Sequence, residues 1–168
     1  MKLRSLLHPL LALLLLSTTG YRPHAHALAV AGKITLTATD DGGQGKDASG
    51  HPAFIGGSEG KNQSTGAAEF MDGASVVTAD TSNLVNGTGS HHGWVMMSKG
   101  ADKVIFSWTG QVQTVVAQGK PPSSTFQGTW KARTGGGRYA GISGQGTYTG
   151  RFTTANTSVA EWKGSIGQ

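Results

Sequence analysis

Residues 134–148 read TGGGRYAGISGQGTY, and the glycines of this stretch punctuate a pattern of aromatic and β-branched side chains. Glycine tolerates positive φ angles and lets neighbouring backbones approach closely, so this spacing is typical of a tight turn that leads into a strongly bent strand. The stretch therefore predicts a β-sheet that curls or closes on itself. It indicates an architecture, and it does not by itself indicate a reaction.

The rest of the chain alternates apolar and polar residues with a period of two and shows no sustained helical period. In residues 125–133 and 144–152, apolar residues and glycines alternate with Gln, Thr, Lys and Arg, so each segment has one dry and one wet face. Residues 33–39 and 158–164 alternate in the same way. About eight such strands are expected, the number at which a closed antiparallel β-barrel has room for side chains or one small ligand. A β-sandwich is the alternative.

Composition and turn residues predict the connections between these strands. Residues 40–67 are rich in Gly, Ser, Lys and Asp with few apolar anchors, which predicts a long loop. The pair Asp72-Gly73 suits a two-residue turn and predicts a hairpin within residues 69–78. A second hairpin is predicted within residues 94–108, where two apolar runs flank a short polar segment.

The N-terminal residues predict a secretory signal peptide over residues 1–27. A basic start is followed by an apolar run, and the segment ends in the small-residue motif Ala-His-Ala. The apolar run is shorter than the about 20 residues that a membrane-spanning helix needs. We therefore expect residues 28–168 to form one secreted or periplasmic β-barrel domain, which is not an integral membrane protein once the signal peptide has been cleaved.

Composition excludes several classes of function. The chain contains no cysteine, which rules out disulfides, thiolate metal sites and a cysteine nucleophile. The formal net charge of +5 includes Lys2, Arg4 and Arg22, which would leave with the signal peptide. No run of Lys or Arg interleaves with aromatic residues, so nucleic acid is not an expected partner. No cofactor is expected either.

The run of residues 135–141, GGGRYAG, resembles the Gly-Gly-x-Gly-aromatic-x-Gly stretch of the allene oxide cyclase and dirigent barrel superfamily. The likeness extends to the last strand, with its Trp162-Lys163-Gly164 ending, and the chain also resembles small secreted bacterial barrel proteins of unassigned activity. The resemblance implies an antiparallel barrel of calycin-type shape with an apolar cavity, assembled as a homotrimer or homodimer. One branch of the superfamily cyclises an unsaturated fatty-acid epoxide and another orients phenoxy radicals. The acidic pocket residues of these branches have no counterpart that can be placed on this sequence.

Six aromatic residues fall on the apolar faces of predicted strands and would point into one interior. They are Trp94, Phe106, Trp108, Trp130, Tyr148 and Trp162. Such rings suit a pocket for a flat, apolar small molecule. The alternative is that they fill the barrel as an ordinary core. The first alternative predicts a ligand-binding barrel, and the second predicts a structural envelope protein.

Glu161 lies between Ala160 and Trp162 on the last predicted strand and is the candidate catalytic residue. A local twist or bulge would turn its carboxyl into the apolar interior, where burial raises the pKa and suits proton transfer. By strict alternation, Glu161 faces water instead. An inward Glu161 would favour a cofactor-free isomerase or cyclase.

Three histidines lie in the predicted domain, at positions 51, 91 and 92. Neutral imidazole is a common metal ligand, but adjacent residues on an extended strand point to opposite sides. His91 and His92 also lie in a stretch rich in Gly and Ser, which predicts exposed loop histidines rather than a metal site. No Gly-x-Ser-x-Gly motif is present, so a hydrolase triad has no support.

Overall fold

A computed structural model of the chain describes residues 27–39 and 42–167. The signal peptide predicted over residues 1–27 lies outside this part of the chain, except for its last residue. Among the described residues there is no helix with the length and hydropathy that crossing a bilayer requires.

The described residues fold into nine strands and one short 3-10 turn. The elements are β1 (Leu28–Ala38), β2 (Gly43–Lys46), β3 (Pro52–Ser64), β4 (Ser75–Val85), β5 (Thr88–Lys99), β6 (Asp102–Val115), β7 (Ser123–Gly136), η1 (Gly137–Tyr139), β8 (Ser143–Phe152) and β9 (Thr157–Gly167).

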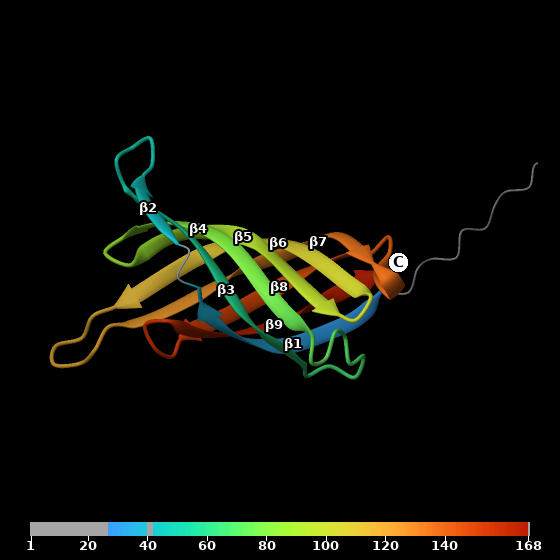
Figure 1. Cartoon of the computed structure of the whole chain (residues 1–168). Helices are drawn as coiled ribbons and strands as arrows, with labels where there is room; N and C mark the ends of the chain where they lie inside the picture. The colour runs from blue at the N-terminus through green and yellow to red at the C-terminus, as the bar shows by residue number, and fades with distance from the viewer. Residues whose placement is uncertain (1–26, 40–41, 168) are drawn as a thin grey trace, which may run out of the picture.

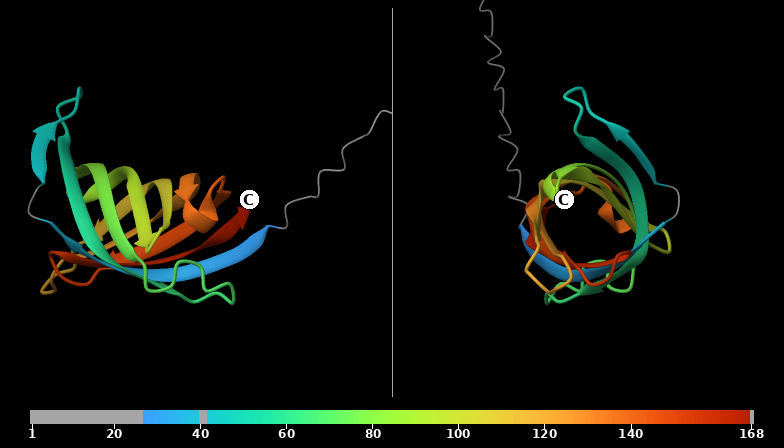
Figure 2. Two further views of the ribbon diagram at one scale, coloured as in Figure 1. Left: turned by 45° about the vertical axis from the view of Figure 1, so that its right-hand side comes forward. Right: turned by 90° about the vertical axis from the view of Figure 1, so that its left-hand side faces the viewer.

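The strands form a closed antiparallel barrel. Their order in the sheet is β1-β9-β8-β7-β6-β5-β4-β3-β2, and β1 also pairs with β3 along residues 32–38 (Figure 1). This second pairing closes eight of the strands on themselves and leaves β2 as an extra strand on β3. Figure 2 shows the ring of strands from one end, with β2 projecting from the wall. The predicted barrel is confirmed, and the sandwich alternative is wrong.

The loop predicted for residues 40–67 is wrong, because β2 and β3 lie within it. β3 is 13 residues long and is hydrogen-bonded to β1 on one side and β4 on the other. Its inward positions carry small or polar residues, among them Gly56, Ser58 and Gly60. Strand pairing on both sides therefore stabilises a segment that lacks the apolar alternation by which a strand is recognised.

The hairpin predicted within residues 69–78 is also wrong. Residues 65–74 form a looped segment between β3 and β4, and Phe70 and Met71 within it are each only 2% exposed. The side chain of Asn62 on β3 donates hydrogen bonds to the carbonyl oxygens of Phe70 and Met71, at 3.2 and 2.9 Å. The Phe70 ring packs edge-on against Tyr139 of η1, with ring centroids 5.0 Å apart. Residues 65–74 thus pack buried side chains into the core at one end of the barrel, and we call this segment the plug.

The hairpin predicted within residues 94–108 is confirmed as β5 and β6, which pair from Lys99 and Asp102 across a two-residue turn. A second tight turn lies at Asn86-Gly87 between β4 and β5, with φ angles of 51° and 74°. Two consecutive positive φ angles are the geometry of the type I′ turn, which matches the twist of antiparallel strands.

Glycines on the inner face of the barrel make room for aromatic rings. A Cβ atom at Gly32 would lie 2.6 Å from the ring of Trp162, and one at Gly93 would lie 2.8 Å from the ring of Trp108. Both distances are far below van der Waals contact, so only glycine fits under these rings. The rings therefore lie back against the barrel wall instead of meeting at its axis.

Candidate functional site

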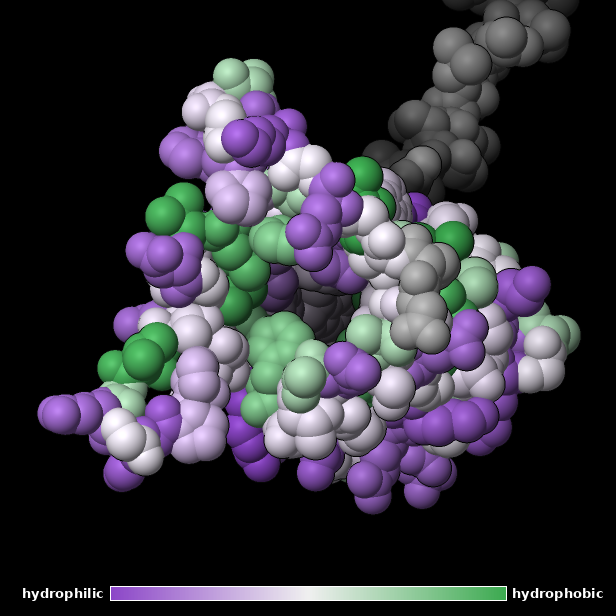
Figure 3. Space-filling view, turned by 60° about the vertical axis from the view of Figure 1, so that its left-hand side comes forward, coloured by the Kyte–Doolittle hydropathy of each residue, from purple (hydrophilic) through white to green (hydrophobic). Residues whose placement is uncertain are grey.

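The interior of the barrel contains a cavity of about 180 Å³. Figure 3 shows the hollowed end of the molecule, where apolar and polar residues both border the opening. The cavity is lined by Ile34, Leu36, Ser58, Thr78, Asp80, His91, Val95, Met97, Phe106, Trp108, Phe126, Trp130, Tyr148, Phe152, Ser158, Ala160 and Trp162. Its wall is therefore mostly aromatic and aliphatic, with a few polar groups.

Five of the six predicted aromatic residues lie along this cavity, namely Phe106, Trp108, Trp130, Tyr148 and Trp162. Their ring contacts fall into two groups. In one, Trp130 packs edge-on against Phe106 and Trp162 with ring centroids 5.1 and 6.2 Å apart; in the other, Trp108 packs edge-on against Tyr148 at 6.0 Å. Phe126 and Phe152, with ring centroids 5.5 Å apart, extend the second group through the contact of Phe126 with Tyr148. Edge-to-face packing of this kind holds the rings in fixed orientations.

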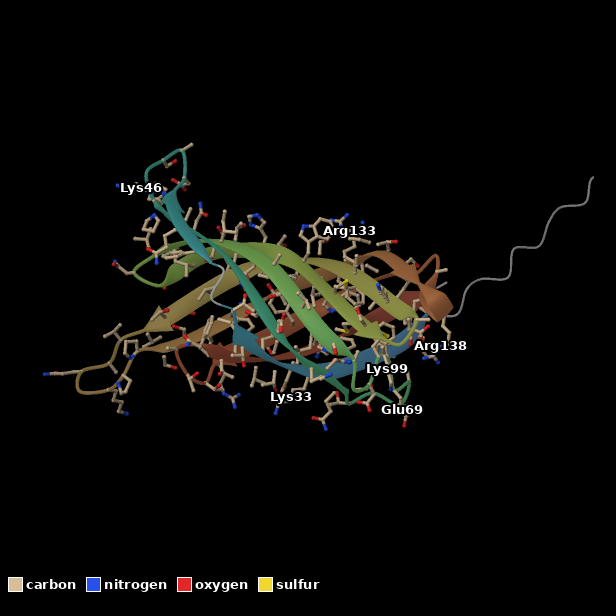
Figure 4. All side chains as sticks on the ribbon, viewed as in Figure 1. Lys33, Lys46, Glu69, Lys99, Arg133 and Arg138 are labelled. Atoms are coloured by element: carbon tan, nitrogen blue, oxygen red, sulfur yellow. The ribbon has the colours of Figure 1, made fainter. Side chains whose placement is uncertain are left out.

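The prediction that Trp94, the sixth aromatic residue, points into the interior is wrong. It is 52% exposed and lies on the outer face of β5, where the guanidinium of Arg133 stands 5.7 Å from its ring centroid. Figure 4 shows Arg133 outside the barrel. The inward positions of β5 are His91, Gly93, Val95 and Met97, so a histidine and a glycine occupy the face that Trp94 was expected to share. Trp94 cannot contact a ligand in the cavity.

Glu161 is exposed on the outer face of β9, as strict alternation indicates. It lies beside Thr149 of β8 and Lys33 of β1 in the strand register. Its carboxyl group is therefore separated from the cavity by the barrel wall. No bulge turns it inward, because the pairing of β9 with β1 and β8 runs without a break through this position.

His91 is the most informative residue that sequence reasoning misplaced. It is only 9% exposed, and its Nε2 atom lies 3.0 Å from the hydroxyl of Tyr148. Its ring also packs on Trp108, with centroids 4.6 Å apart. Burial, aided by the nearby His92, lowers the pKa of His91 to about 4. The expected exposed loop histidine is thus a buried, uncharged imidazole at neutral pH.

Tyr148 shares this uncharged state. Burial raises the pKa of its hydroxyl well above the usual value, so the proton stays on the phenol at neutral pH. One of the two groups donates and the other accepts, and the direction depends on the tautomer of the imidazole. The pair is one of the few polar groups in a mostly apolar wall.

Asp80 on β4 is the acidic residue of the cavity, and the sequence reasoning missed it. Burial raises the pKa of its carboxyl, and the nearby His92 partly opposes this shift. Its partners in the strand register are Gly56 on β3 and Gly93 on β5, so no neighbouring side chain fills the space beside the carboxyl. Alternation from the buried Val76 could have placed Asp80 on the inner face.

The three histidines at positions 51, 91 and 92, which the structure describes, do not form a metal centre. His51 lies beside Asp47, with 3.4 Å between Nδ1 and Oδ2, on the segment that joins β2 and β3. His92 points outward, with its Nε2 atom 2.8 Å from the hydroxyl of Thr81. Across residues 27–39 and 42–167, no group of three or more His, Cys, Asp or Glu side chains is arranged to hold a metal ion.

Comparison of the chain with protein-family models, curated proteins and solved structures finds no match. The barrel architecture is established by the strand pairing itself. Membership of the allene oxide cyclase and dirigent barrel superfamily, and the trimer or dimer that it implies, stay predictions.

Proposed function

We propose that this protein binds one small, largely apolar molecule inside the barrel and carries it outside the cytoplasm. The observation that supports the proposal most strongly is the open cavity among aromatic side chains. A filled barrel would serve a purely structural role, but here the glycines beneath Trp108 and Trp162 let the rings lie against the wall. Binding sites for small molecules are typically apolar hollows with a few polar groups that fix orientation.

The size of the cavity limits the ligand. A dry cavity of about 150 Å³ in another protein accommodates benzene. The cavity of about 180 Å³ here therefore suits a molecule with a single ring or a short chain. The hydrogen-bonded pair of His91 and Tyr148 would orient one polar group of that molecule.

Native mass spectrometry of the mature chain, purified from the secreted or periplasmic fraction, tests this proposal directly. A retained small organic molecule that leaves on denaturation is the expected result, and the same spectrum gives the oligomeric state. Calorimetric titration with 2-phenylethanol is the second readout, because this probe is neutral and has one ring. The proposal fails if the protein retains no molecule and binds no such probe.

A matched pair of variants locates the binding. Ala160 lines the cavity, whereas the adjacent Val159 faces the outer surface. Ala160→Phe should abolish binding of 2-phenylethanol by filling the hollow. Val159→Phe adds bulk to the same strand on the other side of the wall and should leave binding unchanged. Equal binding by both variants would place the ligand elsewhere.

A cofactor-free isomerase is the second candidate function, favoured by the inward carboxyl of Asp80. The carboxylate would take a proton from one carbon of the ligand and return it to another carbon of the same molecule, and the Tyr148 hydroxyl would donate a hydrogen bond to an adjacent oxygen. Incubation of the retained ligand with the protein in D₂O distinguishes the two functions. Deuterium in the released molecule, lost in Asp80→Asn, indicates catalysis, whereas an unlabelled molecule indicates binding alone.

A further inference from the structure

We propose that the ligand is a small organic monocation, a protonated or quaternary amine attached to one apolar ring, whose ammonium group lies against Asp80 and Trp108. This inference rests on the proposed function, because it names the chemical class that the cavity would hold. It is drawn from the charge of the cavity wall and from the space beside Asp80.

The cavity wall carries one carboxyl group without a lysine or arginine beside it in the wall. Asp80 is the single acidic side chain among the described residues that line the cavity, and no lysine or arginine is among them. The lysines and arginines labelled in Figure 4 lie along the outside of the barrel. His91 is uncharged at neutral pH because its pKa is lowered to about 4. A carboxylate in apolar surroundings is favourable only when a cation accompanies it, and an organic cation would supply that charge.

The strand register leaves room for the cation. Gly56, Asp80, Gly93 and Trp108 are successive partners in one row across β3, β4, β5 and β6. Neighbouring strands lie about 4.8 Å apart, so the Cα atoms of Asp80 and Trp108 are separated by roughly 10 Å. The position between them is glycine, and the Trp108 ring reaches over it, 2.8 Å from where a Cβ atom would stand. The Trp108 ring fills the space over Gly93, whereas over Gly56 the only atom within 4 Å of a Cβ position is Asp80 Oδ1, at 3.9 Å. The ammonium group would therefore lie on the cavity side of the carboxylate and the indole, both of which line the cavity.

Further aromatic rings line the same cavity as Asp80. Trp108 packs against His91 and Tyr148 with ring centroids 4.6 and 6.0 Å apart, and Phe126 packs against Tyr148 at 6.3 Å. Aromatic faces attract cations through their quadrupole, and aromatic cages are the usual recognition site for alkylammonium groups. The same cavity would disfavour a carboxylate ligand, because its charge would repel that of Asp80.

Calorimetric titration of the mature chain at pH 7 with three matched probes tests the inference. The probes are 2-phenylethylamine, which is a cation, 2-phenylethanol, which is neutral, and 3-phenylpropanoate, which is an anion. A desolvated, charge-assisted contact contributes about 1.5 to 3 kcal/mol, which corresponds to roughly tenfold to hundredfold in affinity. We expect the amine to bind more tightly than the alcohol by this factor, and the anion to bind least.

Two variants test whether the preference for the amine depends on Asp80. Asp80→Asn keeps the shape of the side chain and should bring the affinities of amine and alcohol within about threefold of each other. Glu161→Gln removes a carboxylate from the outer face of β9 and should leave the preference for the amine unchanged. Thermal melting followed by circular dichroism checks that both variants are folded, and the amine-to-alcohol ratio in the wild-type protein needs no variant at all.

The outcomes separate the two proposals. Equal affinity for amine and alcohol in the wild-type protein would overturn the monocation and leave the binding function standing. A preference for the amine that survives in Asp80→Asn would also overturn the role of Asp80. Failure of all three probes to bind, together with a bare protein in the native mass spectrum, would overturn both.

Discussion

The Nε2 atom of His91 on β5 lies 3.0 Å from the hydroxyl oxygen of Tyr148 on β8, inside the barrel. β6 and β7 separate these two strands in the sheet, so the contact spans the interior rather than linking neighbours along the wall. Both groups are held uncharged at neutral pH by burial, which lowers the pKa of His91 to about 4 and raises the pKa of the Tyr148 hydroxyl well above its usual value. The contact therefore joins two neutral groups and is expected to contribute to stability as well as to ligand orientation.

Tyr148→Phe should lower the free energy of unfolding by about 1 to 2 kcal/mol. The variant removes the hydroxyl and leaves the buried His91 without this partner, and an unsatisfied buried polar group carries a penalty of about that size. Urea denaturation followed by tryptophan fluorescence measures it. Tyr139→Phe is the matched control, because Tyr139 is only partly buried against the plug; a loss of the same size in both variants would contradict the interpretation.

The buried imidazole makes stability depend on pH. The pKa of His91 falls from 6.5 to about 4 on folding, so between these values the unfolded chain binds more protons than the folded one. Stability contributed by the neutral imidazole is therefore full above pH 6.5 and is lost as the pH falls towards 4. The whole shift corresponds to a loss of up to about 3 kcal/mol.

Comparison with His91→Gln isolates this effect. Asp80 on β4 has a raised pKa and titrates in the opposite sense, while His92 lies next to His91 on β5. Both groups are present in the wild type and the variant, so most of their contribution cancels in the difference. Urea midpoints measured from pH 7 to pH 4 should converge as the wild type loses its advantage; parallel curves would mean that the pKa of His91 does not change on folding.

The buried side-chain amide of Asn62 helps to hold the plug against the barrel. Asn62 is 1% exposed, donates to the carbonyl oxygens of Phe70 and Met71, and accepts a hydrogen bond from the Trp162 indole at 3.0 Å. Asn62→Ala should destabilise the protein by about 2 to 4 kcal/mol, since several buried polar groups lose a partner at once. Urea unfolding measures the loss.

Hydrogen exchange adds the local readout for the same change. Faster exchange of the amides in residues 65–74 is expected in Asn62→Ala, because Phe70 and Met71 lose their hydrogen bonds to the Asn62 side chain while the backbone hydrogen bonds of Gly73 and Ala74 to residue 62 remain. The adjacent Gln63 is exposed, so Gln63→Ala should change neither quantity. Unaltered exchange in the plug of Asn62→Ala would show that the backbone hydrogen bonds and the packing of Phe70 hold it without the amide.

The sequence predicted the barrel because its C-terminal strands alternate so regularly. β7, β8 and β9 carry large apolar or glycine residues on one face and long polar residues on the other, and they lie where the pattern indicated. β3 was not predicted, because glycine and serine occupy its inner face and the alternation of apolar and polar residues is missing. The positions of three site residues could not be predicted from polarity either, because the polar His91 and Asp80 point inward while the apolar Trp94 points outward. The usual pattern is therefore reversed at the positions where the cavity has its polar groups.

Glycines beneath aromatic rings connect the sequence pattern to the hollow interior. A substitution at Gly32 tests whether such glycines keep the interior open. A methyl group at Gly32 would stand 2.6 Å from the Trp162 ring, so Gly32→Ala must push that ring towards the barrel axis. Overpacking of this kind should lower the free energy of unfolding by about 1 to 3 kcal/mol. It should also weaken binding of 2-phenylethanol, because the displaced ring occupies part of the cavity. Gly43→Ala on β2 is the control, since a Cβ atom there has nothing within 4 Å. If Gly32→Ala proved as stable as Gly43→Ala and bound the probe equally well, the glycines would not be what keeps the barrel open.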